Sequence, residues 1–236
     1  MQLLMSRMRA AMERYDMVAP GDKIAVGVSG GKDSLALLAG LAGLRRFYPV
    51  PFELVAVTAD PGFFNEQTDY SAIGELCDEW EIAYTVRRTE LYKVIFETRQ
   101  ESNPCSLCAR MRRGILHDMT KAAGCNKLAL GHHMDDAAET FMMNLLSGGT
   151  IGSFRPVTYL SRKDITVIRP MIFATEKEVA SAARREKLPV VKSPCPMDKT
   201  SERQKVKELI AALEKDYPNL RGKITGAMQR GGISGW

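Results

Sequence analysis

A strand, a glycine-containing loop and a helix follow one another between residues 23 and 44, and this succession constrains the fold more than any other part of the sequence. Residues 23–28, KIAVGV, are apolar and rich in β-branched side chains, which is typical of a short buried strand. Residues 29–34, SGGKDS, end this run, and residues 35–44 are rich in Leu and Ala, as in a buried helix. The segment therefore predicts a strand–loop–helix unit, the building block of an α/β fold.

Further apolar runs and amphipathic patterns extend this alternation along the chain. Strands are expected at residues 54–58, 84–87, 127–130 and, more weakly, 165–168. Helices are expected at residues 3–15, 67–80, 135–146, 176–186 and 201–215, with another after residue 108. Strands that alternate with helices predict a parallel sheet with helices on both faces.

The same patterns suggest how the chain is organised. We expect an N-terminal helix within residues 1–20 and one α/β domain at residues 21–190 that carries a Cys-x-x-Cys insertion. Residues 191–236 are expected to form a C-terminal segment with a third cysteine and a basic helix, and residues 226–236 a Gly-rich loose tail.

Composition excludes several classes of protein. Of the 236 residues, 45% are hydrophobic and 26% are charged, values of a globular rather than a disordered chain. No apolar run approaches the ~18 residues of a membrane span, and charged residues within the first fifteen positions argue against a signal-peptide core. We therefore expect a cytoplasmic protein without membrane segments. The net charge of +5 is compatible with an acidic partner such as RNA but does not demonstrate one.

The loop at residues 29–34 has the chemistry of an anion site. Its glycines, Gly30 and Gly31, let the backbone approach a ligand closely, and the helix that follows presents N–H groups and a positive dipole end. Lys32 adds a full charge, and Ser29 and Ser34 add hydroxyl donors. A Walker A loop is excluded, because that motif needs glycine where Val26 stands and Ser or Thr where Asp33 stands. An ordinary Gly-rich turn with a capping serine is the alternative interpretation.

Two histidines and two aspartates follow the strand expected at residues 127–130. The segment from Gly131 to Asp136 reads GHHMDD and opens a helix. The helix dipole favours Asp135 and Asp136 at that place in any case. It does not explain His132 and His133 beside them at a strand end, where α/β proteins bind ligands.

Three of the five cysteines stand in unusual surroundings. Cys105 and Cys108 form a Cys-x-x-Cys pair ahead of several arginines, and Cys195 lies between two prolines that stiffen the chain. A Cys-x-x-Cys pair alone fits zinc, a redox dithiol or an iron–sulfur centre. Cys77 and Cys125 have the pattern of small buried residues.

These motifs carry a family resemblance. SGGKDS after an apolar strand resembles the PP-loop of the ATP pyrophosphatase superfamily, and GHHMDD with the following AAET is similar to the GHHxDDxxET segment of its tRNA-modifying branch. The Cys-x-x-Cys pair with one distant cysteine resembles the tRNA 2-thiocytidine synthetase (TtcA-like) family. The resemblance covers most of the chain and implies an adenine nucleotide alpha-hydrolase-like, Rossmann-type PP-loop domain.

The resemblance also implies a set of functional residues. Lys32, Asp33 and Asp136 would be catalytic, with Mg²⁺ held by Asp33 or Asp136. The family's ATP-binding positions fall here on Ser29, Gly30, Gly31, Lys32, Asp33, Ser34, Val57, Thr58, Gly131 and His133. A [4Fe-4S] cluster would be held by Cys105, Cys108 and Cys195. Candidates for contacts to tRNA phosphates are Arg110, Arg112, Arg113, Lys199, Arg203, Lys205 and Lys207.

The implied reaction is ATP-dependent tRNA thiolation. A pyrimidine carbonyl oxygen would be adenylated with release of pyrophosphate, and sulfur would then displace AMP to give 2-thiocytidine. The sulfur would come from a cysteine desulfurase or from sulfide. Two other interpretations stay open: a tRNA lysidine synthetase-like ligase, which needs no cysteine cluster, and an ATP-binding iron–sulfur or zinc regulatory protein without turnover. The oligomeric state also stays open, with a homodimer as one option.

Overall fold

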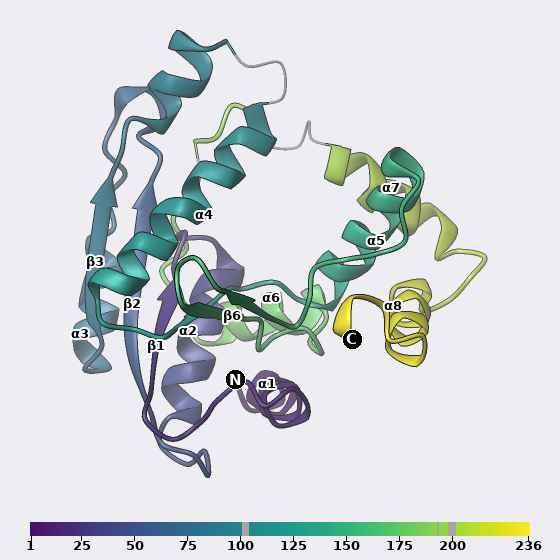
Figure 1. Ribbon diagram of the computed structural model, residues 1–236, viewed down its shortest axis with the longest axis horizontal. Coiled ribbons are helices and arrows are strands. Elements are labelled where there is room, and N and C mark those ends of the chain that lie inside the picture. Colours follow the sequence, from purple (N-terminus) through teal and green to yellow (C-terminus); the bar gives the residue numbers. More distant parts are fainter. Residues whose placement is uncertain (101–103, 193, 198–201) are drawn as a thin grey trace.

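The computed structural model describes residues 1–100, 104–192, 194–197 and 202–236. Within them, six strands form one sheet in the order β3-β2-β1-β4-β6-β5 (Figure 1). All neighbouring pairs are parallel except β5 and β6, which are antiparallel. The strands are β1 (Asp22–Gly27), β2 (Phe52–Asp60), β3 (Ala83–Arg88), β4 (Lys127–Ala129), β5 (Val157–Leu160) and β6 (Ile165–Ile168).

Helices cover both faces of this sheet, which confirms the predicted fold class. The α-helices are α1 (Gln2–Arg14), α2 (Lys32–Leu44), α3 (Ser71–Glu79), α4 (Pro104–Ala122), α5 (Met134–Gly148), α6 (Glu176–Arg185), α7 (Glu202–Leu213) and α8 (Leu220–Arg230). A short π-helix spans Lys93–Thr98, and 3-10 turns span Phe63–Asn65 and Ile233–Gly235. None of the described helices combines the length and apolar character that crossing a bilayer requires.

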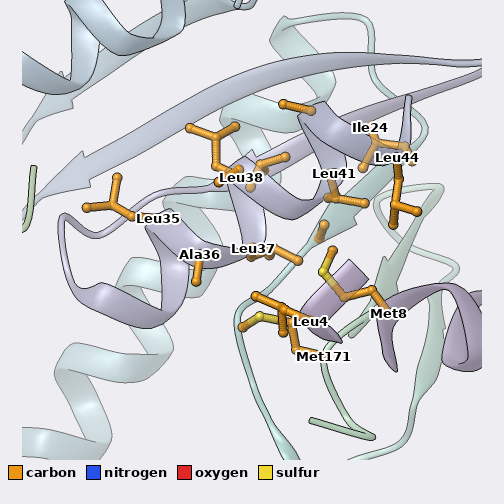
Figure 2. Close-up of a cluster of buried hydrophobic side chains, with 14 of the residues drawn as sticks. Leu4, Met8, Ile24, Leu35, Ala36, Leu37, Leu38, Leu41, Leu44 and Met171 are labelled. Carbon is orange, nitrogen blue, oxygen red and sulfur yellow. The ribbon is translucent and has the colours of Figure 1, made fainter. Parts of the chain in front are cut away.

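The two faces are built from alternate residues of the same strands. Ile24 and Val26 of β1 pack with α2 in the larger core, whereas Ala25 packs on the opposite face, where α4 lies. Side chains along the whole length of α2 fill the larger core together with Leu4 and Met8 of α1 (Figure 2). Because α2 is buried along its length, its first turn is held rigidly at the end of β1.

The sequence did not predict β5, α8 or the π-helix at Lys93–Thr98. β5 was not predicted, because it is an edge strand with little apolar alternation and its Tyr159 is 62% exposed. The loose tail expected at residues 226–236 is wrong: α8 continues to Arg230 and packs on α5. Met228 and Trp236 are buried, and the indole N–H of Trp236 donates to the carbonyl of Phe154 at 2.8 Å. Tertiary burial of these two side chains overrides the local effect of the glycines.

The strand order creates a crevice at one place. After β1 the chain passes through α2 to β2 on one side, whereas β4 lies on the other side of β1. In open α/β sheets, ligands bind at such a reversal, outside the carboxyl ends of the two strands. Here the loop at residues 28–31 follows β1 and the segment at residues 130–133 follows β4, so both predicted motifs lie at this edge.

Candidate active site

The loop after β1 has a fixed conformation. Gly30 has a φ of +85°, and a Cβ atom there would lie 3.0 Å from the Cβ of Val191, so only glycine fits without displacement. The carbonyl of Gly30 accepts a hydrogen bond from the Val191 N–H at 3.0 Å. The Ser34 hydroxyl accepts from the Ser29 N–H at 3.0 Å and donates to the Gly31 carbonyl at 2.9 Å. The loop thus presents the first turn of α2, where helix N–H groups lack intrahelical partners, to the crevice.

The lysine of the loop lies between two carboxylates. The Lys32 ammonium donates to both oxygens of Asp33, at 2.9 and 3.1 Å, and to Oε1 of Glu176 at 3.3 Å. Burial by itself would lower the pKa of Lys32, but Asp33 and Glu176 outweigh that effect and raise it. The lysine is therefore a full cation at the start of α2. Glu176, the first residue of α6, was not predicted to take part, since its contact is made 144 positions away in the chain.

The segment after β4 is packed against the start of α2. A Cβ on Gly131 would lie 3.1 Å from the backbone carbonyl of Asp33, so the missing side chain permits this close approach. His133 is the N-cap of α5 in a capping box: its Nδ1 accepts from the Asp136 N–H at 3.3 Å, and Asp136 Oδ2 accepts from the His133 N–H at 2.9 Å. Asp136 thus has a capping role, while its other oxygen, Oδ1, accepts from Arg203 at 3.0 Å.

The two histidines differ in their surroundings. His133 is 4% exposed, and its Nε2 lies 3.8 Å from Oδ1 of Asp33. The ring of His132 packs on Phe154, with 4.8 Å between centroids. Burial, with a smaller effect from the nearby Arg169 guanidinium, lowers the pKa of His132 to about 4. His132 is therefore neutral at pH 7 and adds no charge to the site.

A cavity of about 340 Å³ joins these segments. Val28, Asp33, Gly131 and His132 line it with Arg112 of α4, and a second cavity of about 180 Å³ adjoins it at Ser29 and Arg112. Residues 57 and 58, predicted from the resemblance to seat the adenosine, lie inside the sheet, and β2 reaches the cavity through Ala59. The Thr58 hydroxyl donates to the carbonyl of Val28 at 2.7 Å, so it stabilises the position at which the loop begins.

The three predicted cluster ligands come from two segments. Cys105 and Cys108 lie in the first turns of α4, and Cys195 lies in the short non-helical segment at residues 194–197. Burial raises the pKa of the Cys105 and Cys108 thiols, and the sulfur of Cys195 is close enough to raise both further. Arg112 acts in the opposite direction on Cys108 and favours its thiolate.

The donor chemistry at this place fits an iron–sulfur cluster. No disulfide is formed by the cysteines of the described segments, so none of these thiols is consumed in a cystine, and Cys195 is near enough to Cys105 and Cys108 to influence both electrostatically. Among the described residues, no three or more His, Cys, Asp or Glu side chains are already gathered at metal-binding distances. Cys77 and Cys125 are buried, as expected, at 0% and 2% exposure.

The predicted basic residues do not all share one location. Arg110 and Arg113 are exposed on α4, whereas Arg112 lines both cavities. Arg203 reaches into the larger cavity, but Lys205 is 70% exposed and pairs with Glu202 of its own helix. Lys207 is turned to Glu176, and Lys199 lies outside the described residues.

Comparison with known proteins agrees with this geometry. The model of the PP-loop domain family matches residues 4–213. A tRNA-cytidine(32) 2-sulfurtransferase from Geobacter sulfurreducens is 40% identical over 92% of this chain and 85% of its own length, and one from Syntrophotalea carbinolica is 41% identical over the same shares. The structure of the U34-tRNA thiolase NcsA from Methanococcus maripaludis, with its [4Fe-4S] cluster, superposes with a TM-score of 0.78 at 29% identity, over 97% of this chain and 77% of that one. The chain therefore belongs to the PP-loop family and, within it, to the family of the tRNA-cytidine(32) 2-sulfurtransferases.

Proposed function

We propose that this protein is an ATP-dependent tRNA sulfurtransferase that converts a cytidine of tRNA to 2-thiocytidine, with AMP and pyrophosphate as products. One observation carries the proposal: the phosphate loop, the histidine–aspartate segment and the Cys-x-x-Cys helix converge on adjoining cavities at the carboxyl edge of the sheet. Its family membership supports the same activity. The protein would act in the cytoplasm, where its tRNA substrate is.

The chain's own residues would bind and orient ATP. The N–H groups of the first turn of α2 and the Lys32 ammonium would receive the phosphates, because a helix N-terminus and a cation both favour an anion. Asp33 and Asp136 present carboxylate oxygens to the cavity, the ligand type that Mg²⁺ prefers. His133 holds the backbone of Asp136 through the capping box, so the carboxylate has a defined direction.

The reaction would proceed in two displacements. The cytidine O2 attacks the α-phosphorus of ATP, forming an O–P bond and breaking the bond to pyrophosphate. Sulfide-level sulfur then attacks C2, and AMP departs with the former O2; sulfur from a desulfurase persulfide would first be released as sulfide by a thiol reductant. Lys32 and the helix N–H groups would stabilise the charge that develops on the phosphates. A [4Fe-4S] cluster on Cys105, Cys108 and Cys195 would supply one iron without a protein ligand, available to inorganic sulfur. Sulfide or a cysteine desulfurase is the proposed sulfur source.

Anaerobic turnover tests this function against its alternatives. Unmodified tRNA, ATP, Mg²⁺ and sulfide are incubated with the protein, and the digested nucleosides are analysed by mass spectrometry. We expect 2-thiocytidine, with AMP formed only when tRNA is present. Lysine attached to cytidine would identify a lysidine synthetase instead. Absence of both AMP and modified nucleoside would favour a regulatory protein.

Binding of tRNA is expected to depend on salt through the exposed arginines of α4. Each phosphate contact releases counterions, so binding through Arg110 and Arg113 weakens about sevenfold or more between about 50 and 200 mM salt. Arg110→Ala and Arg113→Ala should each lower the slope of log Kd against log salt by about 1. Lys121→Ala, at the far end of the same helix, is the matched control. An affinity that does not change with salt would show that these arginines are ordinary surface residues.

A further inference from the structure

Two cations of α7 reach the residues that surround the phosphate loop. Arg203 donates from Nη1 to Oδ1 of Asp136 at 3.0 Å and from Nη2 to the hydroxyl of Thr140 at 3.1 Å. One turn later, the Lys207 ammonium donates to both oxygens of Glu176, at 2.8 and 2.7 Å. Both cations are only partly exposed, at 40% and 37% of their side-chain surface. Arg203 lines the cavity of about 340 Å³, and Lys207 is directed to Glu176, which also accepts from the loop lysine.

Glu176 connects these cations to the loop lysine. Its Oε1 atom accepts from Lys207 and also from Lys32, at 3.3 Å. Burial alone would raise the pKa of Glu176, but the two ammonium groups outweigh it and lower the pKa, so the carboxylate is charged. The backbone N–H of Glu176 donates to Oδ2 of Asp135 at 2.7 Å, which fixes the start of α6 beside α5. A single anchored carboxylate thus holds two ammonium groups together at the edge of the site.

We infer that α7 supplies a second cationic side to the nucleotide site, in which Arg203 and Lys207 bind the phosphate chain of ATP opposite the loop. Glu176 is a positioning residue that keeps Lys207 near Lys32. The inference rests on the proposed function, since it takes ATP as the ligand.

The charge of the ligand supports this assignment. A triphosphate with one bound Mg²⁺ still carries about two negative charges, more than Lys32 and the roughly half charge of the helix N-terminus would balance. Phosphate oxygens accept from a guanidinium in the same forked geometry in which Arg203 now binds Asp136 and Thr140. The Arg203 side chain already lines the cavity, so an acceptor on the ligand would lie within its reach. The sequence had indicated a contact to tRNA for Arg203, and its location in the cavity favours the nucleotide instead.

Equilibrium binding of ATP, pyrophosphate and adenosine to the full, anaerobically purified chain tests the inference in the absence of tRNA. Arg203→Ala and Lys207→Ala should each weaken the binding of ATP and of pyrophosphate at least about fivefold, the effect of losing one charge-assisted contact. The affinity for adenosine should change by less than about twofold. Lys215→Ala removes the same charge from an exposed position just beyond α7 and should leave all three ligands unchanged. Arg203→Lys keeps the charge but lacks the paired N–H donors of the guanidinium. Its affinities for ATP and pyrophosphate should therefore lie between those of the unchanged protein and of Arg203→Ala.

The outcomes separate this inference from the proposed function. If Lys32→Ala weakens pyrophosphate but the α7 variants do not, α7 has no phosphate role and the proposed function stands. If Lys32→Ala also has no effect, the phosphate site itself is wrong and the inference falls with it. An equal loss of affinity for adenosine and for ATP would show that α7 only stabilises the shape of the cavity, which contradicts the inference. Arg203→Gln and Lys207→Gln give the same test should the alanine variants fail to fold.

Discussion

Single replacement of Cys105, Cys108 or Cys195 by alanine is expected to remove most of the iron and abolish tRNA thiolation, while ATP binding survives. A cluster with one open iron has only three protein ligands, so the loss of one leaves too few to retain it. The ATP site should persist, because the loop at residues 28–34 is held by Val191 and by its own serines and not by the cysteines. Loss of the cluster is measured by iron content and by the absorbance band at ~400 nm. Nucleoside analysis measures thiolation, and equilibrium binding measures ATP affinity.

Cys77→Ala and Cys125→Ala are the matched controls for this prediction. Both thiols are buried, and burial raises the pKa of Cys77 to about 11, so neither is a ready thiolate. These variants should keep iron and thiolation. Stoichiometric zinc without iron in protein prepared without oxygen would contradict the cluster. A redox dithiol would require Cys105 and Cys108 but leave the Cys195 variant active.

Lys32→Ala is expected to lower ATP affinity at least tenfold, which is about 1.4 kcal/mol. The loss has two physical parts. The phosphates lose a cation at the start of α2, and the carboxylates of Asp33 and Glu176 lose the ammonium group that now lies between them. Glu176 keeps its pair with Lys207, but the Asp33 carboxylate loses its ammonium partner and would repel a polyphosphate, so the effect should exceed that of a simple surface charge.

Titration calorimetry with ATP at constant ionic strength measures this change, and AMP formation with tRNA gives an independent readout. Lys23→Ala is a suitable control, because Lys23 lies near the start of β1, at the opposite edge of the sheet, and pairs with the exposed Glu53. Unchanged ATP affinity and turnover in Lys32→Ala would disprove the assignment of the phosphate loop.

The sequence was sufficient wherever a signal is local. The strand, loop and helix at residues 22–44 were predicted because a buried β-branched run, two glycines and an apolar helix are all contiguous. The same reasoning identified the segment from Gly131 to Asp136 and the pair Cys105 and Cys108, since each group of functional side chains lies within a few consecutive residues. Family resemblance added the chemistry that links these segments, and the family is confirmed.

Only the tertiary structure decided which distant residues meet. The contact of Lys32 with Glu176 joins residues 144 positions apart, and that of Arg203 with Asp136 joins residues 67 apart. No periodicity relates such positions, because the register of α6 and α7 against the sheet depends on which apolar faces pack together. The same reason applies to the C-terminal segment: its glycines suggested a loose tail, but burial of Trp236 beneath Phe154 stabilises an ordered end that no local pattern shows.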